Sequence, residues 1–351
     1  MIIYYFIFFV LTLLFLSEIF NKRFSNINTW IITIFFIFFV GIRYGVGNDY
    51  FAYYDNYNGI NNGSDTDSTE IFYVLLNKVL NFELVIFFFS FFSFFFLKKA
   101  IDFFNPRYGV ISYLVFYSLF LITFDIHIIR QGLAISLVLF GYKYLFLKRY
   151  LTFLLIVVLA STFHLSALIL VPFILLIQLK FSIKSQLFLI GLSFIVFIYQ
   201  DVVVETYYKL AMNIPLMSKY LLVYRQEERI SYGISSGMIL DVIVLIALFF
   251  KLKQFNDKEN FLFRIYFISV ILSVLLSLDP AALRLVYYFR VVIIFLIPLF
   301  FKYFKFQIFT LLIVCLICLQ YLITTFTVIG EYGRGDRNLK YYSIFNKHDY
   351  P

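Results

Sequence analysis

Long apolar runs follow one another along almost the whole chain, with short polar stretches between them. Most of them approach the roughly 20 residues that an α-helix needs to cross a bilayer. They are apolar on every face, unlike the strands of a membrane barrel, which alternate apolar and polar residues. Spanning helices are therefore predicted at residues 2–20, 29–42, 84–97, 110–126, 128–147, 183–199, 237–250, 261–278, 285–301 and 306–329.

The stretch 151–179 is apolar over almost its full length, but the sequence STFHLS at Ser161–Ser166 interrupts it. It predicts either one long tilted helix or two short segments that meet at His164. The flanking charges favour the second arrangement, because a hairpin places all of them on one side of the membrane. These flanking residues are Lys148, Arg149, Lys180 and Lys184.

Composition narrows the class of protein. Hydrophobic residues make up 63% of the 351 positions and charged residues 14%, against about 45–50% and 25% in soluble domains. Disordered chains are polar, and two cysteines are too few for a disulfide scaffold. We expect an all-α, polytopic membrane bundle with roughly ten to twelve spanning segments. It would form one domain over 1–330, with outward loops at 43–82 and 200–236 and a polar C-terminal tail at 331–351.

The basic residues predict the topology. The net charge of +9 is typical of the positive-inside bias of cytoplasmic loops and does not require nucleic acid as a partner. Placing the most basic loops in the cytoplasm leaves both termini facing outward. The run Ile2–Ile19 has no basic residue before it and no small-residue cleavage site after it, so we expect a retained span and not a signal peptide.

Under this topology the two faces differ in the type of basic residue. The cytoplasmic set holds twelve Lys and four Arg, and the outward set five Lys and eight Arg. Topology needs only positive charge, whereas the planar guanidinium binds phosphate in bidentate fashion. An Arg inside an apolar run raises the free energy of membrane insertion by about 2.5–3.5 kcal/mol, so such an arginine usually pairs with another group or has a functional role. The outward set predicts a phosphate or diphosphate site; pairing with loop carboxylates or lipid headgroups is the alternative.

The first polar cluster is GIRYGVGNDYFAYY, at Gly41–Tyr54. Arg43 directly follows a predicted span, and two glycines after it permit a tight turn. Asp49 is flanked by tyrosines that can stack on sugar rings. The purely structural alternative is that Arg43 and Asp49 pair and fix the loop.

The second cluster is FDIHIIRQG, at Phe124–Gly132. His127 and Arg130 are three residues apart and share a face if the segment is helical. His127 titrates near neutrality, and Asp125 is placed to orient it. The alternative is a polar turn that caps the next helix.

The third candidate is His164 itself. A lone intramembrane histidine is more often hydrogen-bonded structure than a catalyst. Its place at a break in an apolar run favours a role, because irregular backbone at membrane depth must line a cavity or pack on protein.

The fourth cluster is DPAALRLVYYFR, which begins at Asp279 and suits a helix start at its proline. Arg284 and Tyr288 share a helix face, and Arg290 lies further along. Arg284 and Arg290 are candidates to grip a diphosphate, with interfacial snorkelling as the alternative.

Other motifs exclude some chemistry. Cys315 and Cys318 have CxxC spacing inside an apolar span with no polar ligand nearby, which favours packing. No Walker or GxGxxG loop is present, so we expect no nucleotide cofactor. We also expect no metal, because the one Asp-x-Asp sequence, at Asp65–Asp67, sits in a Ser/Gly-rich loop and favours a solvated turn.

Taken in order, GIRYGVGNDYFAYY, IRQGLAISLVLFGYKYL, ASTFHLSALILVPF and RLVYYFR resemble the EpsG family of bacterial membrane proteins, over roughly residues 30–300. That family is associated with exopolysaccharide synthesis and is grouped with Wzy-type repeat-unit polymerases. The resemblance implies a multi-pass protein of the bacterial inner membrane that polymerises polyprenyl-diphosphate-linked oligosaccharides outside the cytoplasm. The resemblance also implies a role in capsule or O-antigen synthesis. It implies a flippase and a chain-length regulator as partners.

The resemblance carries six positions over to this sequence: Arg43, Asp49, Arg130, His164, Arg284 and Arg290. We expect Arg43, Arg130, Arg284 and Arg290 to bind the diphosphate. The base that accepts a proton from the acceptor sugar would be His127, His164 or Asp49. Supporting roles fall to Asp125, Asp279 and Tyr288. The geometric expectation is that the guanidinium groups converge beside a cavity beneath the outer leaflet.

Other functions fit the same features less well. A flippase or transporter of lipid-linked oligosaccharides would show sites on both faces and often repeat halves, but the Arg enrichment is one-sided and no repeat is evident. A ligase differs from a polymerase only in its acceptor. An O-acyltransferase would use an intramembrane histidine such as His164. A membrane subunit without chemistry is the remaining alternative.

Overall fold

The computed structural model describes residues 2–20, 25–63, 70–199, 236–277, 280–304, 307–332 and 339–347, with four isolated positions between 202 and 209. Their regular structure is helical, apart from one antiparallel bridge between Arg43 and Ser343. The chain forms two compact units, Met1–Ile174 with Val291–Pro351, and Leu175–Arg290.

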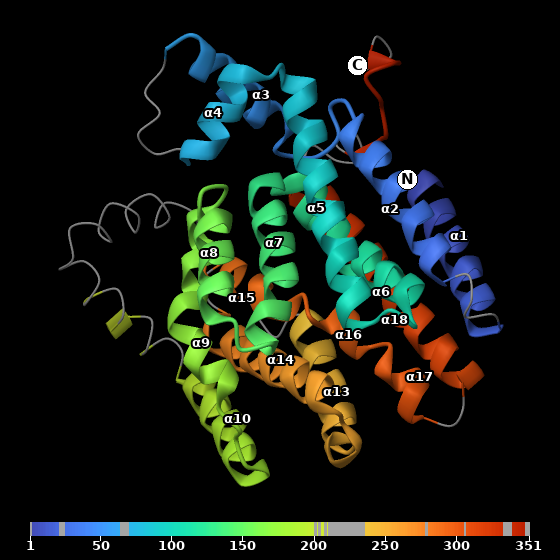
Figure 1. Ribbon diagram of the computed structural model, residues 1–351, viewed down its shortest axis with the longest axis vertical. Coiled ribbons are helices and arrows are strands. Elements are labelled where there is room, and N and C mark those ends of the chain that lie inside the picture. The colour runs from blue at the N-terminus through green and yellow to red at the C-terminus, as the bar shows by residue number, and fades with distance from the viewer. Residues whose placement is uncertain are drawn as a thin grey trace. The chain divides into compact units, whose positions relative to one another are not determined.

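The first unit contains most of the helices (Figure 1). Its first half consists of α1 (Ile2–Phe20), α2 (Ser25–Gly41), α3 (Tyr50–Asn61), α4 (Ile71–Val79), α5 (Phe82–Phe104), α6 (Gly109–Phe116), the π-helix η2 (Tyr117–His127), α7 (Ile129–Phe146), α8 (Tyr150–Ser161) and the 3₁₀-helix η3 (Leu165–Ile169). The returning chain adds α16 (Ile293–Leu296), α17 (Leu299–Tyr303) and α18 (Gln307–Tyr332).

The second unit is smaller and begins within α9 (Leu170–Gln178). Its other elements are α10 (Ile183–Ile198), α13 (Ser236–Phe249), the 3₁₀-helix η4 (Leu252–Gln254), α14 (Asp257–Leu275) and α15 (Pro280–Arg290). The start of α14 is set by a capping box, in which Asn256 and Glu259 each accept a hydrogen bond from the other's backbone N–H. The expected outward loop 200–236 lies almost entirely outside the described residues.

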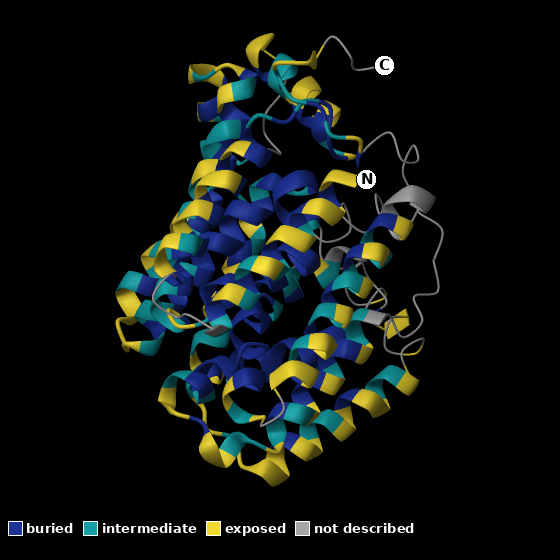
Figure 2. Cartoon of the chain, turned by 90° about the vertical axis from the view of Figure 1, so that its right-hand side faces the viewer, coloured by how far each residue is buried: buried dark blue, intermediate teal, exposed yellow. Residues whose placement is uncertain are grey.

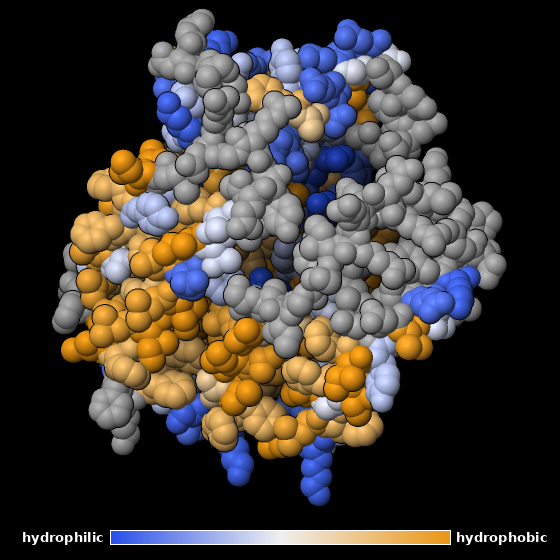
Figure 3. Space-filling view, turned by 180° about the vertical axis from the view of Figure 1, so that it is seen from behind, coloured by the Kyte–Doolittle hydropathy of each residue, from blue (hydrophilic) through white to orange (hydrophobic). Residues whose placement is uncertain are grey.

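Burial within the first unit separates a core from a lipid-facing shell. Almost every residue of α6 and η2 is buried, whereas α1 and α18 leave most of their residues accessible (Figure 2). The accessible side chains are large and apolar, for example Phe6 on α1 and Ile308 and Phe309 on α18. Figure 3 shows such side chains spread widely over the visible face. Water would penalise this surface, and the hydrocarbon of a bilayer would not.

Helix lengths agree with a membrane protein. Within the described ranges, five helices are long and apolar enough to span: Ile2–Ile19, Phe82–Phe104, Gly109–His127, Ala282–Tyr303 and Gln307–Thr327. Five shorter apolar helices accompany them. The predicted class, an all-α polytopic membrane protein, is confirmed. The predicted span 285–301 lies within Ala282–Tyr303, and turns at Val291–Val292 and Ile297–Pro298 divide this stretch into α15, α16 and α17.

The interruption at His164 is confirmed as a break. Helix α8 ends at Ser161, and His164 is extended, with φ −156° and ψ 113°. The chain then reverses, so that η3 packs against α8. Helices α3 and α4 lie within the predicted outward loop 43–82.

The π-helix η2 was not predicted, and it shapes the centre of the unit. Such helices are rare and usually limited to one turn. The segment ends where the N–H of Ile128 donates to the carbonyl of Thr123, 2.9 Å away. Helix α7 then packs closely against this end: a Cβ atom on Gly132 would lie 2.2 Å from the carbonyl oxygen of Phe124. Glycine is therefore needed at 132.

We predict that Gly132→Ala destabilises the protein, by about 1–3 kcal/mol as in other overpacked cores. Thermal denaturation in detergent measures this as a lower midpoint. Gly191→Ala on α10 is the matched control, because nothing lies within 4 Å of its added Cβ. A Gly132→Ala midpoint equal to that of Gly191→Ala would contradict the close packing.

Candidate functional site

One carboxylate in the first unit contacts two cationic side chains from distant parts of the chain. Glu70 precedes α4, but its side chain makes no hydrogen bond to the start of that helix. It turns instead to Arg130, whose Nη1 lies 2.5 Å from Glu70 Oε2. His164 Nδ1 lies 2.9 Å from Glu70 Oε1. We call Glu70, Arg130 and His164 the Glu70 cluster.

Each member of the cluster sits where a helix begins or breaks. Arg130 is in the first turn of α7, directly after the end of η2, and His164 occupies the break between α8 and η3. Aromatic packing holds these ends together. The ring of Phe163 meets that of Phe72 on α4 edge-on, with 4.8 Å between centroids. Backbone next to His164 is thereby fixed against backbone next to Glu70.

Two tyrosines surround the guanidinium of Arg130. Its Cζ atom lies 4.9 Å from the ring centroid of Tyr73 and 5.8 Å from that of Tyr53, within the range of cation–π attraction. Burial raises the pKa of both tyrosine hydroxyls, although Arg130 acts in the opposite direction. Both therefore stay neutral, and the charges of the cluster are those of Glu70, Arg130 and, when protonated, His164.

The cluster is charged and partly open to solvent. Burial alone would raise the pKa of Glu70, but the hydrogen bond with His164 and the charge of Arg130 outweigh it and lower the pKa below its ordinary value of 4.5. The exposed fractions of the side chains are 15% for Glu70, 24% for Arg130 and 29% for His164. A ligand can thus reach groups that are already held in place.

Asp49 lies near Tyr53, whose ring faces Arg130 of this cluster. It directly precedes α3 and is half-buried. Its charge raises the pKa of the Tyr53 hydroxyl, which also accepts a hydrogen bond from Arg130. Asp49 and Arg130 therefore act in opposite directions on the pKa of the same hydroxyl.

Arg43 is fully buried and binds backbone carbonyls. Its guanidinium donates to Val40 O at 2.7 Å, and to Val46 O and Ile126 O at 3.3 Å each. These bonds join the loop after α2 to the end of η2. Gly47 permits the approach, because it has φ +106° and a Cβ there would meet Ile126 O at 2.7 Å. This geometry favours the structural alternative for Arg43, with carbonyls in place of Asp49 as its partners.

His127 and Asp125, at the end of η2, are also buried. The N–H of Asn48 donates to His127 Nδ1 at 3.0 Å, and Ser93 Oγ donates to Asp125 Oδ1 at 2.5 Å. Ser136 lies 3.0 Å from Ser93. The remaining polar atoms, His127 Nε2 and Asp125 Oδ2, have no hydrogen-bond partner among the described residues. The structure thus brings His127 to the loop after α2, and the expected contact with Asp125 is not among its hydrogen bonds.

The second unit holds the other predicted residues. Arg290 Nε lies 2.6 Å from Asp241 Oδ2, and Tyr266 donates to the same carboxylate at 3.1 Å. Arg284 is exposed on α15 and Tyr288 is buried. Asp279 lies outside the described residues. The diphosphate roles expected of Arg284 and Arg290 stay predictions.

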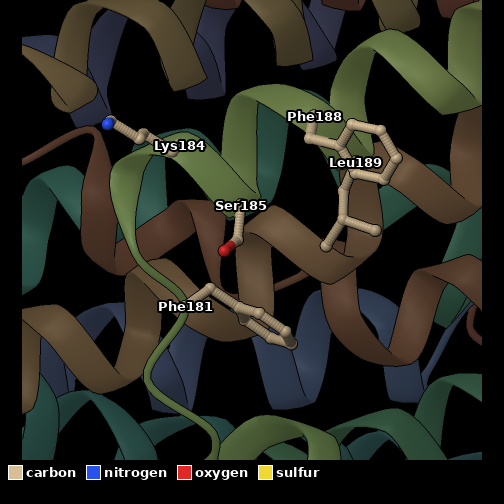
Figure 4. A pocket seen from close by; sticks show the side chains of 5 residues that line it. All are labelled: Phe181, Lys184, Ser185, Phe188 and Leu189. Carbon is tan, nitrogen blue, oxygen red and sulfur yellow. The ribbon is translucent and has the colours of Figure 1, made fainter.

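A shallow hollow also lies in the second unit, beside the start of α10. Figure 4 shows that Lys184 extends away from the other lining side chains. The lining residues are Phe181, Lys184, Ser185, Phe188 and Leu189. No group of three or more His, Cys, Asp or Glu side chains that could hold a metal occurs among the residues described.

The sequence therefore identified two of the three members of the cluster. Arg130 and His164 interrupt apolar runs, so they can be recognised as candidates in the sequence. Glu70, Tyr53 and Tyr73 were missed, because acidic and aromatic residues are ordinary in an outward loop. The only signal was the position of Glu70 directly before an amphipathic helix.

We predict that acidification removes stability that depends on Glu70. Because folding lowers the pKa of Glu70, its contribution is complete above its unfolded pKa, about 4.3, and is lost as the pH falls through the lower folded pKa. Thermal midpoints of the wild type and Glu70→Gln, measured in detergent from neutral pH to about 3, should differ at neutral pH and converge in acid. The exposed Asp55→Asn change is the control. A constant difference at all pH values would argue against the charged contact.

Comparison with known proteins identifies the family of the chain. The sequence model described as the EpsG family matches residues 26–343, nearly the whole chain. No curated protein and no solved structure matches the chain. The family match and the apolar helices lead to one conclusion: this multi-pass membrane protein belongs to the EpsG family, which supports a polymerase-like role in polysaccharide synthesis.

Proposed function

We propose that the protein is a glycosyltransferase that joins polyprenyl-diphosphate-linked oligosaccharide units on the extracytoplasmic side of the membrane, with the Glu70 cluster as its reaction centre. The observation that carries the proposal is the carboxylate of Glu70 held between Arg130 and His164. An anion-binding cation and an oriented proton acceptor then stand side by side, at helix ends, in a partly open position.

Arg130 would act on the leaving group. The donor glycan carries a polyprenyl diphosphate, and negative charge grows on the diphosphate oxygens as the bond to the anomeric carbon breaks. A guanidinium presents several N–H donors in one plane and stays protonated. Glu70 and the two tyrosines already fix its orientation, so little reorganisation is needed during the reaction. Removing one such preorganised donor typically costs about 10²–10³ in rate.

His164 would act on the acceptor. Its Nδ1 faces Glu70, so the other ring nitrogen, Nε2, is the one left to meet a sugar hydroxyl. A carboxylate beside Nδ1 fixes the tautomer and stabilises the imidazolium that forms, as in hydrolytic triads. In the step we propose, the acceptor oxygen bonds to the anomeric carbon and its proton passes to Nε2. The bond to the diphosphate breaks, and the lipid diphosphate leaves with the electron pair.

We predict that Arg130→Lys lowers kcat by about 10²–10³, because an ammonium keeps the charge and loses the planar fork. The assay is the ladder of longer glycans that purified protein forms from the lipid-linked repeat unit alone. Arg107→Lys, at an exposed position, is the matched control. Equal ladders from the two variants would show that Arg130 does not bind the diphosphate.

We also predict that His164→Asn lowers kcat by about 10²–10⁴, the usual contribution of a positioned base. Glu70→Gln should have a smaller effect in the same direction, because the amide can still orient the imidazole but cannot stabilise its charge. The same ladder assay compares both with Asp55→Asn. Normal activity of His164→Asn would show that the acceptor needs no base at this position.

A further inference from the structure

The segment near the C-terminus, residues 339–347, lies against the loop that follows α2. The N–H of Tyr44 donates to Tyr342 O, and the N–H of Ile344 donates to Ile42 O, each at 2.9 Å. These bonds form the bridge between Arg43 and Ser343. We call residues 339–347 the C-terminal segment and residues 42–48 the Arg43 loop.

Side chains of the segment also contact the end of α2. The ring of Tyr341 stacks on Phe39, with centroids 4.5 Å apart and planes 6° from parallel. Its hydroxyl donates to Phe39 O at 2.9 Å. Burial raises the pKa of this hydroxyl to about 12, so it remains a donor at physiological pH. Leu339 and Tyr342 are buried as well.

This attachment is not needed to anchor the helix that precedes it. Helix α18 already packs against η2 and α17. Its Phe326 contacts the rings of Tyr4 and Tyr5 edge-on, at 5.4 and 5.6 Å. The contacts of the C-terminal segment are therefore additional, and they are concentrated on α2 and the Arg43 loop.

The Arg43 loop connects directly to the chain that carries Arg130. The guanidinium of Arg43 donates to Ile126 O, and the N–H of Asn48 donates to His127 Nδ1. Residues 126–128 end the π-helix, and Arg130 stands in the next turn. Hydrogen bonds thus join each step from the C-terminal segment to the first turn of α7, and every step lies within one compact unit.

We propose that the C-terminal segment is a positioning element of the Glu70 cluster: by pairing with the Arg43 loop, it fixes the end of η2 and so the place of Arg130. The catalytic consequence rests on the proposed function. A displacement of about 1 Å from a change far from the reacting atoms can cost about 100-fold in rate. Tyr341 and Ile344 are accordingly positioning residues, and neither touches the cluster.

Two changes in the full-length protein test this. Tyr341→Ala removes the stacking and the hydroxyl, and Ile344→Pro removes the N–H that pairs with Ile42. Phe345→Ala is the matched control, because it removes a ring from the same segment where the side chain is 80% exposed. Tyr341→Phe keeps the stacked ring and should restore most of what Tyr341→Ala loses.

The first measurement is backbone hydrogen exchange in peptides that cover residues 45–48 and 126–132. We expect at least tenfold faster exchange there in Tyr341→Ala and Ile344→Pro than in the wild type, and no change in Phe345→Ala. Unchanged exchange in both peptides would overturn the proposal. This measurement needs no substrate, so it tests the positioning role even if the wild type forms no polymer. Failure of the wild type to form polymer would count against the proposed function alone.

The second measurement is the ladder assay at several concentrations of the lipid-linked unit. We expect kcat to fall tenfold or more in Tyr341→Ala, with KM almost unchanged and with recovery in Tyr341→Phe. Wild-type kcat in Tyr341→Ala and Ile344→Pro, with the wild type active, would refute the positioning role. A fall in all variants, including Phe345→Ala, would also refute it, because the effect would then be one of general stability.

Discussion

The shared carboxylate of Glu70 is the interaction on which the candidate site depends. A guanidinium and an imidazole that stood together without it would repel each other once both were charged, and neither would have a fixed orientation. Glu70 offsets this charge and directs one oxygen to each partner. Burial of this anion has a cost, which Arg130 and His164 offset, and Glu70 makes no capping bond to the start of α4. A residue placed to stabilise its own helix instead joins three distant segments.

The bundle brings these segments together by interrupting its helices. A continuous helix satisfies its own backbone in a bilayer, whereas irregular backbone at that depth has to pack on protein or line a cavity. The π-helix ends before Arg130, and the chain breaks at His164. At both points freed backbone groups find partners inside the protein: Arg43 and Asn48 bind the end of η2, and the N–H of His164 still donates to Ala160 O. The same irregularities that a bilayer penalises create the site.

Much of this could be predicted from the sequence, and the limits have physical causes. Apolar runs of spanning length predicted the helical membrane class, and polar residues inside such runs marked Arg130 and His164. Glu70 could not be recognised, because a charge in a polar loop carries no insertion cost. Burial of Arg43 also escaped prediction, since residue type does not show whether a guanidinium faces a ligand or carbonyls. The contacts of the C-terminal segment run largely through backbone atoms, which leave no motif, and a run that is apolar on every face hides the change from α to π winding.

The winding of η2 constrains how this chain can change over time. The apolar residues of η2 are buried in the core, so only substitutions that conserve volume are well tolerated there. Removing or adding one residue is different, because each position turns an α-helix by about 100°. An in-frame deletion within Tyr117–His127 would let the segment relax towards ordinary α-helix and would rotate Arg130 away from Glu70. Lineages of this protein should therefore keep the length of this segment, even where volume-conserving substitutions change its residues.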